Sequence, residues 1–410
     1  MQKDMIVHQM DVVTAFLNGE LDEEIYMQQP DGYQVSGKEN LVCRLKKSLY
    51  GLKQAPRCWN RALNEFMMQA GFVQSNADPC VFIRLDEHLT IVAVYVDDLI
   101  LTTDVLEVML ETKRLLSERF RMKDMGQLHY CLGVNIVYGQ SCVWLHQKQY
   151  ITLMLRKFGL ADANTVSTPA DCNVKLVKDD HVSNSTDQAE YQSMVGSLLY
   201  IAMGTRPDIA QAVGAVSKFC SNPTEAHKTA VKRIFRYLKK TINLALKYCK
   251  DGKPITGFSD ADWAGDLDDR HSTTGNVFLL AGGAISWLSK KQAVVALSTS
   301  EAEYVALSLA AQEAAWLQKL LTDLQIPTKP IVIKEDSQGA IALARNPIAH
   351  SRTKHIDIRF HFIREAQEEG TIDTVYCPTS EMVADLLTKP IPRGQFEKLR
   401  TLMGVEELVD

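Results

Sequence analysis

The sequence predicts a multidomain protein of the α/β and α+β classes, and three observations support this prediction. The chain has 410 residues, whereas one compact domain usually holds about 100–200. Hydrophobic residues make up 46% and charged residues 23%, which is ordinary for a globular chain with a buried core. Strand-like and helical patterns alternate along the chain, and one polar stretch interrupts them. These features exclude a mostly disordered or fibrous protein.

The patterns divide the chain into residues 1–160, 161–253 and 254–410. In the first part, Ile91–Thr103 contains two β-rich runs around an acidic turn, which predicts a hairpin. Apolar residues at helical spacing predict a helix over Asp104–Phe120. The second part opens with a polar linker, rich in Asp, Asn, Ser and Thr, that extends to Asp187. Three predicted helices follow at Gln188–Met203, Pro207–Cys220 and Pro223–Thr241.

The third part predicts a mixed sheet packed by helices, because strands come first and then alternate with helices. Its predicted strands are Ile255–Phe258, Asn276–Leu280, Ala284–Trp287, Ala293–Ser298, Ile331–Glu335 and Thr371–Tyr376. Its predicted helices are Glu301–Leu324, Ser337–Ala344 and Ser380–Leu387. Ala281-Gly282-Gly283 separates the second and third strands, which is a hairpin signal.

Several classes of protein are disfavoured by composition. No run of about 18 apolar residues is present, so we expect no membrane partner. Met1–Met10 has no apolar segment typical of a secretory signal. Nine cysteines, an odd number without C-x-x-C pairs, predict reduced thiols in an intracellular protein rather than disulfides or a zinc site. The formal net charge of −5 and the pI near 6.1 taken alone argue against a nucleic-acid partner.

A first acidic set lies at the ends of strand-like runs. Asp97 and Asp98 follow an apolar run, and Asp11 ends another. Charged side chains are seldom buried unless they are paired or bind a metal, although Asp is also common in solvated turns. Carboxylates from two strands suit Mg²⁺, which prefers oxygen ligands. Because side chains alternate along a strand, we expect only one of Asp97 and Asp98 to be the principal partner of Asp11.

A second acidic set lies at four element ends in the third part. Its members are Asp260, Glu303, Asp336 and Asp385. Carboxylates that converge on one sheet edge are typical of two-metal phosphodiesterase sites. Helix capping is the alternative for each, because acids favour helix N-termini, and we adopt it for Glu301. Asp262 shares a strand face with Asp260, so periodicity does not separate these two.

Three motifs connect the first part to a known family. Gln9–Gly19, Ser48–Arg57 and Tyr95–Asp98, in this order and spacing, resemble the reverse transcriptases of copia-type LTR retrotransposons, and the third part resembles the ribonuclease H of the same Pol polyproteins. The resemblance implies a polymerase palm and thumb-like part over 1–160, a helical connection over 161–253 and a ribonuclease H-like domain over 254–410. The family carries a fingers region before the Asp11 motif, so an N-terminally truncated palm is expected.

The resemblance also implies roles in the first site. Asp11 and Asp97 would bind two Mg²⁺ ions, one activating the primer 3′-hydroxyl and the other holding the triphosphate, with Asp98 as an accessory carboxylate. Phe16 resembles the steric gate that favours deoxynucleotides, with core packing as the alternative. The remaining predicted substrate contacts are Gln54 with the incoming nucleotide, and Lys53 and Arg57 with template or phosphate unless they form a solvated basic face.

In the second site, the resemblance implies that Asp260, Glu303, Asp336 and Asp385 bind two Mg²⁺, with Mn²⁺ as an alternative, and activate water to cut RNA in an RNA–DNA hybrid. The 2′-hydroxyls would identify the RNA strand. Asp357 competes with Asp385 for the fourth position. For His355 and His361 we expect packing or substrate contact rather than zinc. Lys290 and Lys291 would contact phosphate or lie in a solvated surface.

We therefore predict a reverse transcriptase with ribonuclease H activity. Its expected partners are an RNA template, a DNA primer, their hybrid, deoxynucleotides and other Pol parts such as integrase. Basic residues in Arg44–Arg61 and Lys228–Lys240 would receive the hybrid duplex. The expected location is cytoplasmic particles, with the nucleus as the alternative. A chain with nuclease activity alone, or a non-enzymatic nucleic-acid-binding remnant, are the competing hypotheses.

Overall fold

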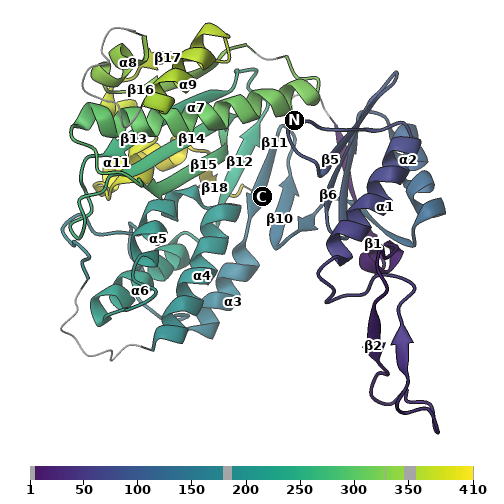
Figure 1. Ribbon diagram of the computed structural model, residues 1–410. Helices are drawn as coiled ribbons and strands as arrows, with labels where there is room; N and C mark the ends of the chain where they lie inside the picture. Colours follow the sequence, from purple (N-terminus) through teal and green to yellow (C-terminus); the bar gives the residue numbers. More distant parts are fainter. Residues whose placement is uncertain (1–4, 179–186, 328, 346–356, 410) are drawn as a thin grey trace. The chain divides into compact units, whose positions relative to one another are not determined.

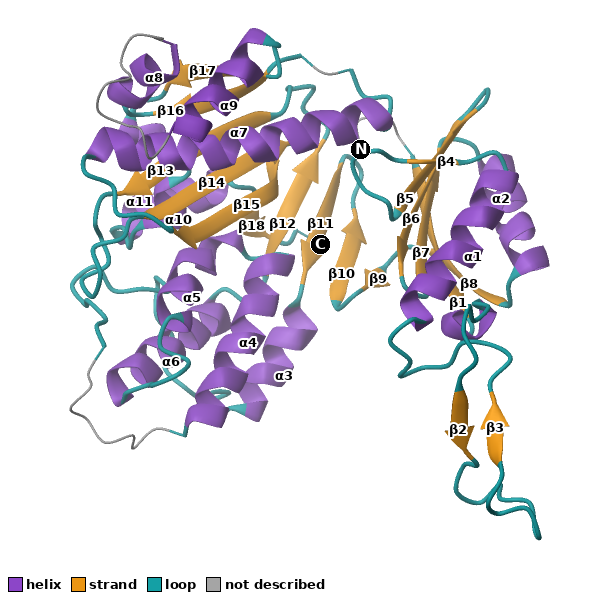
Figure 2. Cartoon of the chain, viewed as in Figure 1, coloured by secondary structure: helices purple, strands orange, loops and turns teal. Residues whose placement is uncertain are grey.

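The computed structural model describes residues 5–178, 187–327, 329–345 and 357–409, with only the backbone described for 357–361 (Figure 1). The chain forms two compact units. One contains the described residues of Lys3–Leu128 together with Lys319–Ile326, and the other contains those of His129–Gln318 and Pro327–Asp410. Strands and helices are mixed in both units, so the predicted α/β and α+β class is confirmed (Figure 2).

The first unit is built on a six-stranded antiparallel sheet in the order β4-β5-β6-β7-β1-β8. Its strands are β1 (Ile6–Val12), β4 (Val73–Gln74), β5 (Val81–Leu85), β6 (Leu89–Tyr95), β7 (Asp98–Thr103) and β8 (Met122–Gln127). Its helices are η1 (Ala15–Asn18), α1 (Ala55–Gln69) and α2 (Leu106–Arg119), and a separate hairpin pairs β2 (Tyr26–Gln28) with β3 (Val42–Arg44). The predicted β6–β7 hairpin and the helix that follows it are confirmed.

Alternation along β1 separates the core of this unit from its polar face. Met10 and Val12 are buried in one cluster with Trp59, Leu63 and Met67 of α1. These three residues recur every fourth position, so they share one helix face. Gln9 and Asp11 alternate with the two core residues of β1 and therefore face away from α1. The sheet thus leaves a polar face on which Asp11 lies.

The second unit begins with a five-stranded antiparallel sheet in the order β18-β12-β11-β10-β9. Its strands are β9 (Tyr130–Cys131), β10 (Val134–Tyr138), β11 (Cys142–His146), β12 (Leu244–Cys249) and β18 (Val405–Glu407). The helices between β11 and β12 are α3 (Lys148–Lys157), α4 (Gln188–Gly204), η2 (Pro207–Ile209), α5 (Ala210–Ser217) and α6 (Glu225–Lys240). The three helices predicted between Gln188 and Thr241 are therefore present, the middle one as η2 followed by α5.

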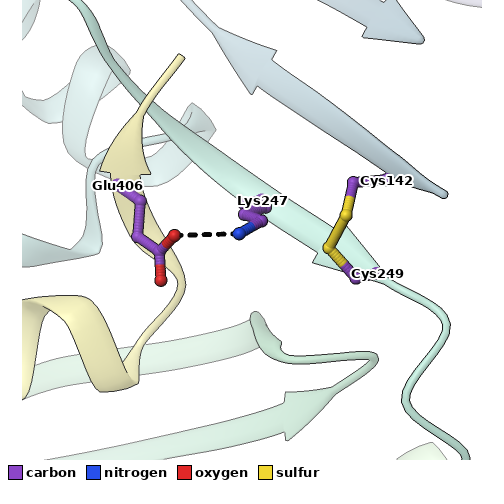
Figure 3. The surroundings of a disulfide bond; sticks show 4 residues. All are labelled: Cys142, Lys247, Cys249 and Glu406. Carbon is purple, nitrogen blue, oxygen red and sulfur yellow. Dashed lines mark hydrogen bonds and ion pairs between the residues drawn. A yellow bond between two sulfur atoms is a disulfide. The ribbon is translucent and has the colours of Figure 1, made fainter. Parts of the chain in front are cut away.

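The sulfur atoms of Cys142 and Cys249 form a disulfide, so the expectation of reduced thiols is wrong for this pair (Figure 3). The antiparallel register places Cys142 of β11 directly opposite Cys249 of β12, with their Cα atoms 4.2 Å apart. Sequence spacing gave no sign of this pairing, because 107 residues separate the two cysteines. The other seven cysteines form no disulfide.

The polar linker lies along α6 and has no helix or strand in its described part. Basic side chains of α6 bind its backbone and side chains: Arg236 and Lys239 donate to the carbonyls of Asn164 and Ala163, and Lys240 donates to Ser167. Lys228 forms an ion pair with Glu190. These four side chains therefore hold the linker and α4, and the expectation that Lys228–Lys240 receives a hybrid duplex stays a prediction.

The C-terminal sheet has the order β15-β14-β13-β16-β17, with antiparallel pairing up to β13 and parallel pairing beyond it. Its strands are β13 (Thr256–Asp262), β14 (Thr273–Leu280), β15 (Gly283–Lys291), β16 (Ile331–Glu335) and β17 (Ile372–Tyr376). Its helices are α7 (Thr299–Asp323), α8 (Gln338–Arg345), α9 (Asp357–Glu368), η5 (Thr379–Glu381), α10 (Asp385–Thr388) and α11 (Arg393–Leu402). Figure 1 shows α7 crossing one face of the sheet. The predicted mixed sheet packed by helices is confirmed.

Two predicted elements of this part differ from the structure. Ala293–Ser298 forms no strand, because its apolar residues have no partner strand beside them, and Leu297 is 75% exposed. The predicted helix Ser380–Leu387 is instead two short helices, η5 and α10, and α11 and β18 were not predicted. Glu301 caps α7 as expected: its carboxylate accepts from the Leu297 N–H, and the Glu301 N–H donates to Ser298.

Within the described residues, none of the helices combines the length and the apolar character that crossing a membrane requires.

Candidate active sites

The first acidic set lies where β1 meets the β6–β7 hairpin. Asp11 pairs in register with Asp98, the first residue of β7. The Asp98 carboxylate accepts a hydrogen bond from the Gln9 side chain at 2.8 Å. Asp97 occupies the turn, and its carbonyl accepts from the Val12 N–H at 2.8 Å. All three carboxylates are half-buried, and they come from two neighbouring strands and one turn.

A hydrogen bond from α1 fixes this turn. Val96 has a left-handed backbone, with φ of 57°, which is strained for a β-branched residue. The buried indole of Trp59 donates to the Val96 carbonyl at 2.7 Å. Trp59 therefore holds the turn that carries Asp97, and sequence reasoning missed it because a buried Trp on a helix is usually core packing.

The predicted substrate contacts surround the same end of the sheet. Phe16 lies in η1, packs partly on the core and contacts Tyr50 with ring centroids 4.7 Å apart. Gln54 is the N-cap residue of α1 and is half-buried. Lys53 and Arg57 are exposed. Phe16 thus packs partly on the core and also occupies the position in the motif that resembles the steric gate. The cationic side chains of Lys53 and Arg57 lie at the surface.

Three members of the second acidic set converge from three elements. Asp260 comes from β13, Glu303 from the first turns of α7, and Asp336 directly follows β16. One carboxylate oxygen from each of the three lies within 4.8 Å of the others. Thr379 donates to the Asp336 carboxylate at 2.7 Å and orients it. Parallel pairing of β13 with β16 brings the ends of these strands to one edge, which explains the convergence.

Burial makes this cluster electrostatically costly without a cation. Burial and the charges of Asp260, Glu335 and Asp336 raise the pKa of Glu303 well above its ordinary value. Burial also raises the pKa of Glu335, which ends β16 and is fully buried. Sequence reasoning missed Glu335. The signal was its place beside Asp336, at a position of β16 whose neighbours Ile331 and Ile333 also face the core.

Asp385 lies beside the cluster and forms an ion pair with Lys389. It is buried, and its Oδ1 lies 2.7 Å from Nζ of Lys389, which is 3.7 Å from Oδ2 of Asp260. Thr388 donates a short hydrogen bond to the same oxygen of Asp260. Burial raises the pKa of Asp260, whereas Lys389 opposes this effect. Sequence reasoning missed Thr388 and Lys389, although Lys389 stands four residues after Asp385.

Gly275 allows the segment that carries these residues to approach the sheet. It lies opposite Asp260 in the β13–β14 register. A Cβ on Gly275 would lie 2.7 Å from Cγ2 of Thr388 and 2.9 Å from the Ala384 carbonyl. No larger residue fits at this position without a shift of α10.

Other predicted residues lie apart from the cluster. Asp262 lines a cavity of about 380 Å³ beside Lys389, and burial raises its pKa to about 6. Lys291 pairs with Asp266 and Asp269, while Lys290 is exposed. Asp357 begins α9, but its side chain lies outside the described residues, as do His355 and the side chain of His361.

The cluster fits a hard divalent cation. Its donors are carboxylate oxygens, which Mg²⁺ prefers. Oε2 of Glu303 and Oε2 of Glu335 are buried and have no hydrogen-bond partner. Buried carboxylates need a compensating charge or a hydrogen bond, so a cation among Asp260, Glu303 and Asp336 would supply what the protein does not.

Carboxylates that converge at one sheet edge, as those of Asp260, Glu303 and Asp336 do, are typical of metal-dependent enzymes of the nucleotidyltransferase and nuclease type. The reverse transcriptase (RNA-dependent DNA polymerase) family matches residues 1–172. The chain is also 35% identical to the transposon Ty5-1 protein of Saccharomyces cerevisiae over 73% of this chain and 98% of that protein. The chain therefore belongs to the retrovirus-related Pol polyproteins of copia-type transposons.

Longer relatives match nearly the whole chain. The Pol polyprotein from transposon TNT 1-94 of Nicotiana tabacum is 44% identical over 98% of this chain and 31% of its own length. The one from transposon RE1 of Arabidopsis thaliana is 41% identical over 97% and 27%. The chain thus spans about a third or less of these relatives. Among solved structures, LC11-RNase H1 from compost matches 35% of this chain and 96% of its own, with 17% identity and a TM-score of 0.27.

Proposed function

We propose that the C-terminal site hydrolyses the RNA strand of an RNA–DNA hybrid with the help of bound Mg²⁺ or Mn²⁺. The observation that carries this proposal is the convergence of Asp260, Glu303 and Asp336, whose oxygens lie within 4.8 Å of one another. Membership of the Pol polyprotein family supports the substrate class, because retroelement copying produces such hybrids.

Each residue of the C-terminal site has its own proposed role. Asp260, Glu303 and Asp336 would hold the cation, which when bound activates water and stabilises charge on the phosphate. Thr379 keeps the Asp336 carboxylate in place through its hydroxyl. Thr388 orients Asp260 from the other side. Asp385 stands behind Lys389 and is the fourth proposed carboxylate of the site.

Replacing one ligand tests the nuclease. Asp336→Asn should lower Mg²⁺-dependent cleavage of a labelled hybrid by at least about 100-fold, because a neutral amide is a poor Mg²⁺ ligand. The matched control is Asp162→Asn at an exposed position of the linker. Cleavage at the wild-type rate in Asp336→Asn would move the nuclease site elsewhere.

For the first unit we propose RNA-directed DNA synthesis at Asp11, Asp97 and Asp98. The arrangement of two strand residues and a turn residue at one end of the sheet supports this proposal, as does the family match over residues 1–172. Phe16, Gln54, Lys53 and Arg57 are the proposed contacts to deoxynucleotide, template and primer. Mg²⁺ is the proposed cation here as well.

Primer extension on an RNA template tests this second activity. Asp97→Asn combined with Asp98→Asn should abolish extension and leave hybrid cleavage unchanged, because the two acidic sets belong to different compact units. Asp31→Asn, at an exposed position of the same unit, is the control. Extension that survives the double change contradicts the assignment, whereas a wild-type chain that cleaves hybrids without extending primers has nuclease activity alone.

The proposed partners follow from these reactions: an RNA template, a DNA primer, their hybrid, deoxynucleotides and other Pol parts such as integrase. We propose that the reactions take place in cytoplasmic particles, with the nucleus as the alternative compartment.

A further inference from the structure

Two adjacent positions of the C-terminal site are suited to positive charge. The first lies among Asp260, Glu303 and Asp336, whose oxygens are grouped within 4.8 Å. The second lies between Asp260 and Asp385, whose side chains are both 2% exposed. Asp260 contributes to both positions. A site with two metal ions would place one ion at each.

The second position already holds a cation from the chain. Nζ of Lys389 lies 2.7 Å from Oδ1 of Asp385 and 3.7 Å from Oδ2 of Asp260. An ammonium at these distances compensates both buried carboxylates, as a shared metal ion would. The Lys389 side chain is 40% exposed, so its stem reaches the site from the solvent side while its charge lies between the two acids.

The first position differs in this respect. Oε2 of Glu303 is buried without a hydrogen-bond partner, and Glu303 as a whole is 8% exposed. Lys389 is close to Asp260 and Asp385 but forms no ion pair with Glu303 or Asp336 among the described residues. Among the described residues, the second position therefore has a cation in direct contact with both of its acids, whereas the first feels the charge of Lys389 on Glu303 only at longer range.

The local fold delivers Lys389 to this place. Asp385 begins α10 and Lys389 directly follows its last residue, so this single helical turn brings the two side chains together. Thr388 donates to Asp260 and anchors the segment between them. Gly275 of β14 lets this segment lie directly over the strand. These contacts arrange Lys389 as a fixed component of the site rather than a loose surface lysine.

We infer that Lys389 replaces the second metal ion, so that the C-terminal site binds one divalent cation and uses the ammonium as its second positive charge. The inference rests on the proposed nuclease function for its biological meaning. Its test, however, is the number of ions bound, which is measured without any cleavage.

The ion count is measured with Mn²⁺, whose free form is quantified by electron paramagnetic resonance. The full chain carries Asp11→Asn, Asp97→Asn and Asp98→Asn, so that the first acidic set does not contribute ions. We expect one bound Mn²⁺ per chain at saturation. We expect two when Lys389→Met is added, because Asp385 and Asp260 then lack their counter-ion, and one when Lys389→Arg is added.

Lys398→Met is the matched control, since Lys398 is exposed on α11 and donates only to the Ser380 carbonyl among its recorded contacts. It should leave one ion bound. A count of zero or two with Lys389 present overturns the inference, as does an unchanged count of one in Lys389→Met. If Lys389→Met does not fold, the number of Mn²⁺ ions bound by the chain that retains Lys389 still tests the inference.

A second measurement separates this inference from the nuclease proposal. Thermal unfolding without metal should begin at a lower temperature in Lys389→Met than in Lys398→Met, and added Mg²⁺ should raise the midpoint more in the former. Hybrid cleavage by the chain with two bound ions would leave the nuclease standing and refute the role of Lys389. One bound ion without hybrid cleavage would support the role of Lys389 and contradict the nuclease proposal.

Discussion

Single residues decide how closely the acidic groups of this chain approach one another. Asp260 receives Thr388 and Lys389 only because the residue opposite it on β14 has no side chain. Trp59 plays a comparable part in the first unit, where its indole holds the strained turn before Asp97. In both sites, an uncharged neighbour positions the acidic residue: Gly275 for Asp260 and Trp59 for Asp97.

Gly275→Ala should therefore disturb the C-terminal site from outside the acidic set. The added methyl group would overlap Thr388 and the Ala384 carbonyl, and forcing extra volume into a packed site costs about 1–3 kcal/mol. We expect this loss in the free energy of unfolding from urea titration, together with reduced hybrid cleavage.

The control for this substitution is Gly196→Ala, which lies on α4 with no atom within 4 Å of the new Cβ. It should be neutral or stabilise the chain by up to about 1 kcal/mol, because alanine favours the helix. Equal stability of Gly275→Ala and wild type would show that α10 moves aside without cost.

At the scale of elements, a buried charged network joins η2 to α6. Arg206 is fully buried and donates twice to Asp208, at 2.9 and 2.8 Å, while the Tyr237 hydroxyl donates to Asp208 at 2.6 Å. Arg206 also donates to Thr241 at the end of α6. Helices that pack apolar faces alone can slide, whereas these bonds fix one arrangement.

This network predicts a specific dependence of stability on pH. Burial alone would raise the pKa of Asp208, but Arg206 and the bonds from Arg206 and Tyr237 hold it below its ordinary value of 3.8. The stabilisation is therefore complete above about pH 4 and is lost as the pH falls through the lower folded-state pKa. Asp208→Asn, which breaks the buried pair, should cost about 3–5 kcal/mol at pH 7.

The measurement is urea unfolding of wild type and Asp208→Asn at neutral and acidic pH. The difference between the two should shrink in acid, because the wild-type carboxyl then takes up its proton. Asp162→Asn, at an exposed site, should show no such difference at either pH. A gap that stays constant down to pH 2 would contradict the assignment to Asp208.

The elements that the sequence revealed are those whose partners lie nearby. The β6–β7 hairpin, α2, α4, α6 and α7 follow from periodicity and turn residues, which are local signals. Ala293–Ser298 has the same β-rich composition as a strand, but no neighbouring strand pairs with it, and only the tertiary structure reveals this. In the site, four acids stood at element ends, whereas Glu335 and Lys389 required knowledge of which side chains are buried together.

At the scale of the whole molecule, long-range covalent and non-covalent links define the second unit. The Cys142–Cys249 disulfide closes a segment of 107 residues that contains α3 to α6. One hydrophobic cluster runs from these helices into the C-terminal sheet, including Leu198, Phe235, Val277 and Leu387. The helical connection and the C-terminal sheet therefore share a core.

Removing the disulfide should destabilise this unit through the unfolded chain. A disulfide contributes typically about 2–4 kcal/mol, and up to about 4.7 kcal/mol for a loop of about 100 residues, mainly by limiting the unfolded state. Cys142→Ser with Cys249→Ser should lower the unfolding free energy of the second unit by this amount under oxidising conditions, and not in dithiothreitol. Cys80→Ser, at an exposed free thiol, is the control. Equal stability in both conditions would mean that the pair is reduced in solution.

The place of β18 has a consequence for how the protein is synthesised. Val405–Glu407 pairs with Leu244–Leu246 of β12, so a strand made after the entire C-terminal sheet completes the sheet that precedes it. Until Val405–Glu407 has been made, β12 presents an unpaired edge that can recruit other chains. The sheet that begins the second unit is therefore completed only after the residues that follow the C-terminal sheet have been made, and the edge of β12 needs protection from aggregation until then.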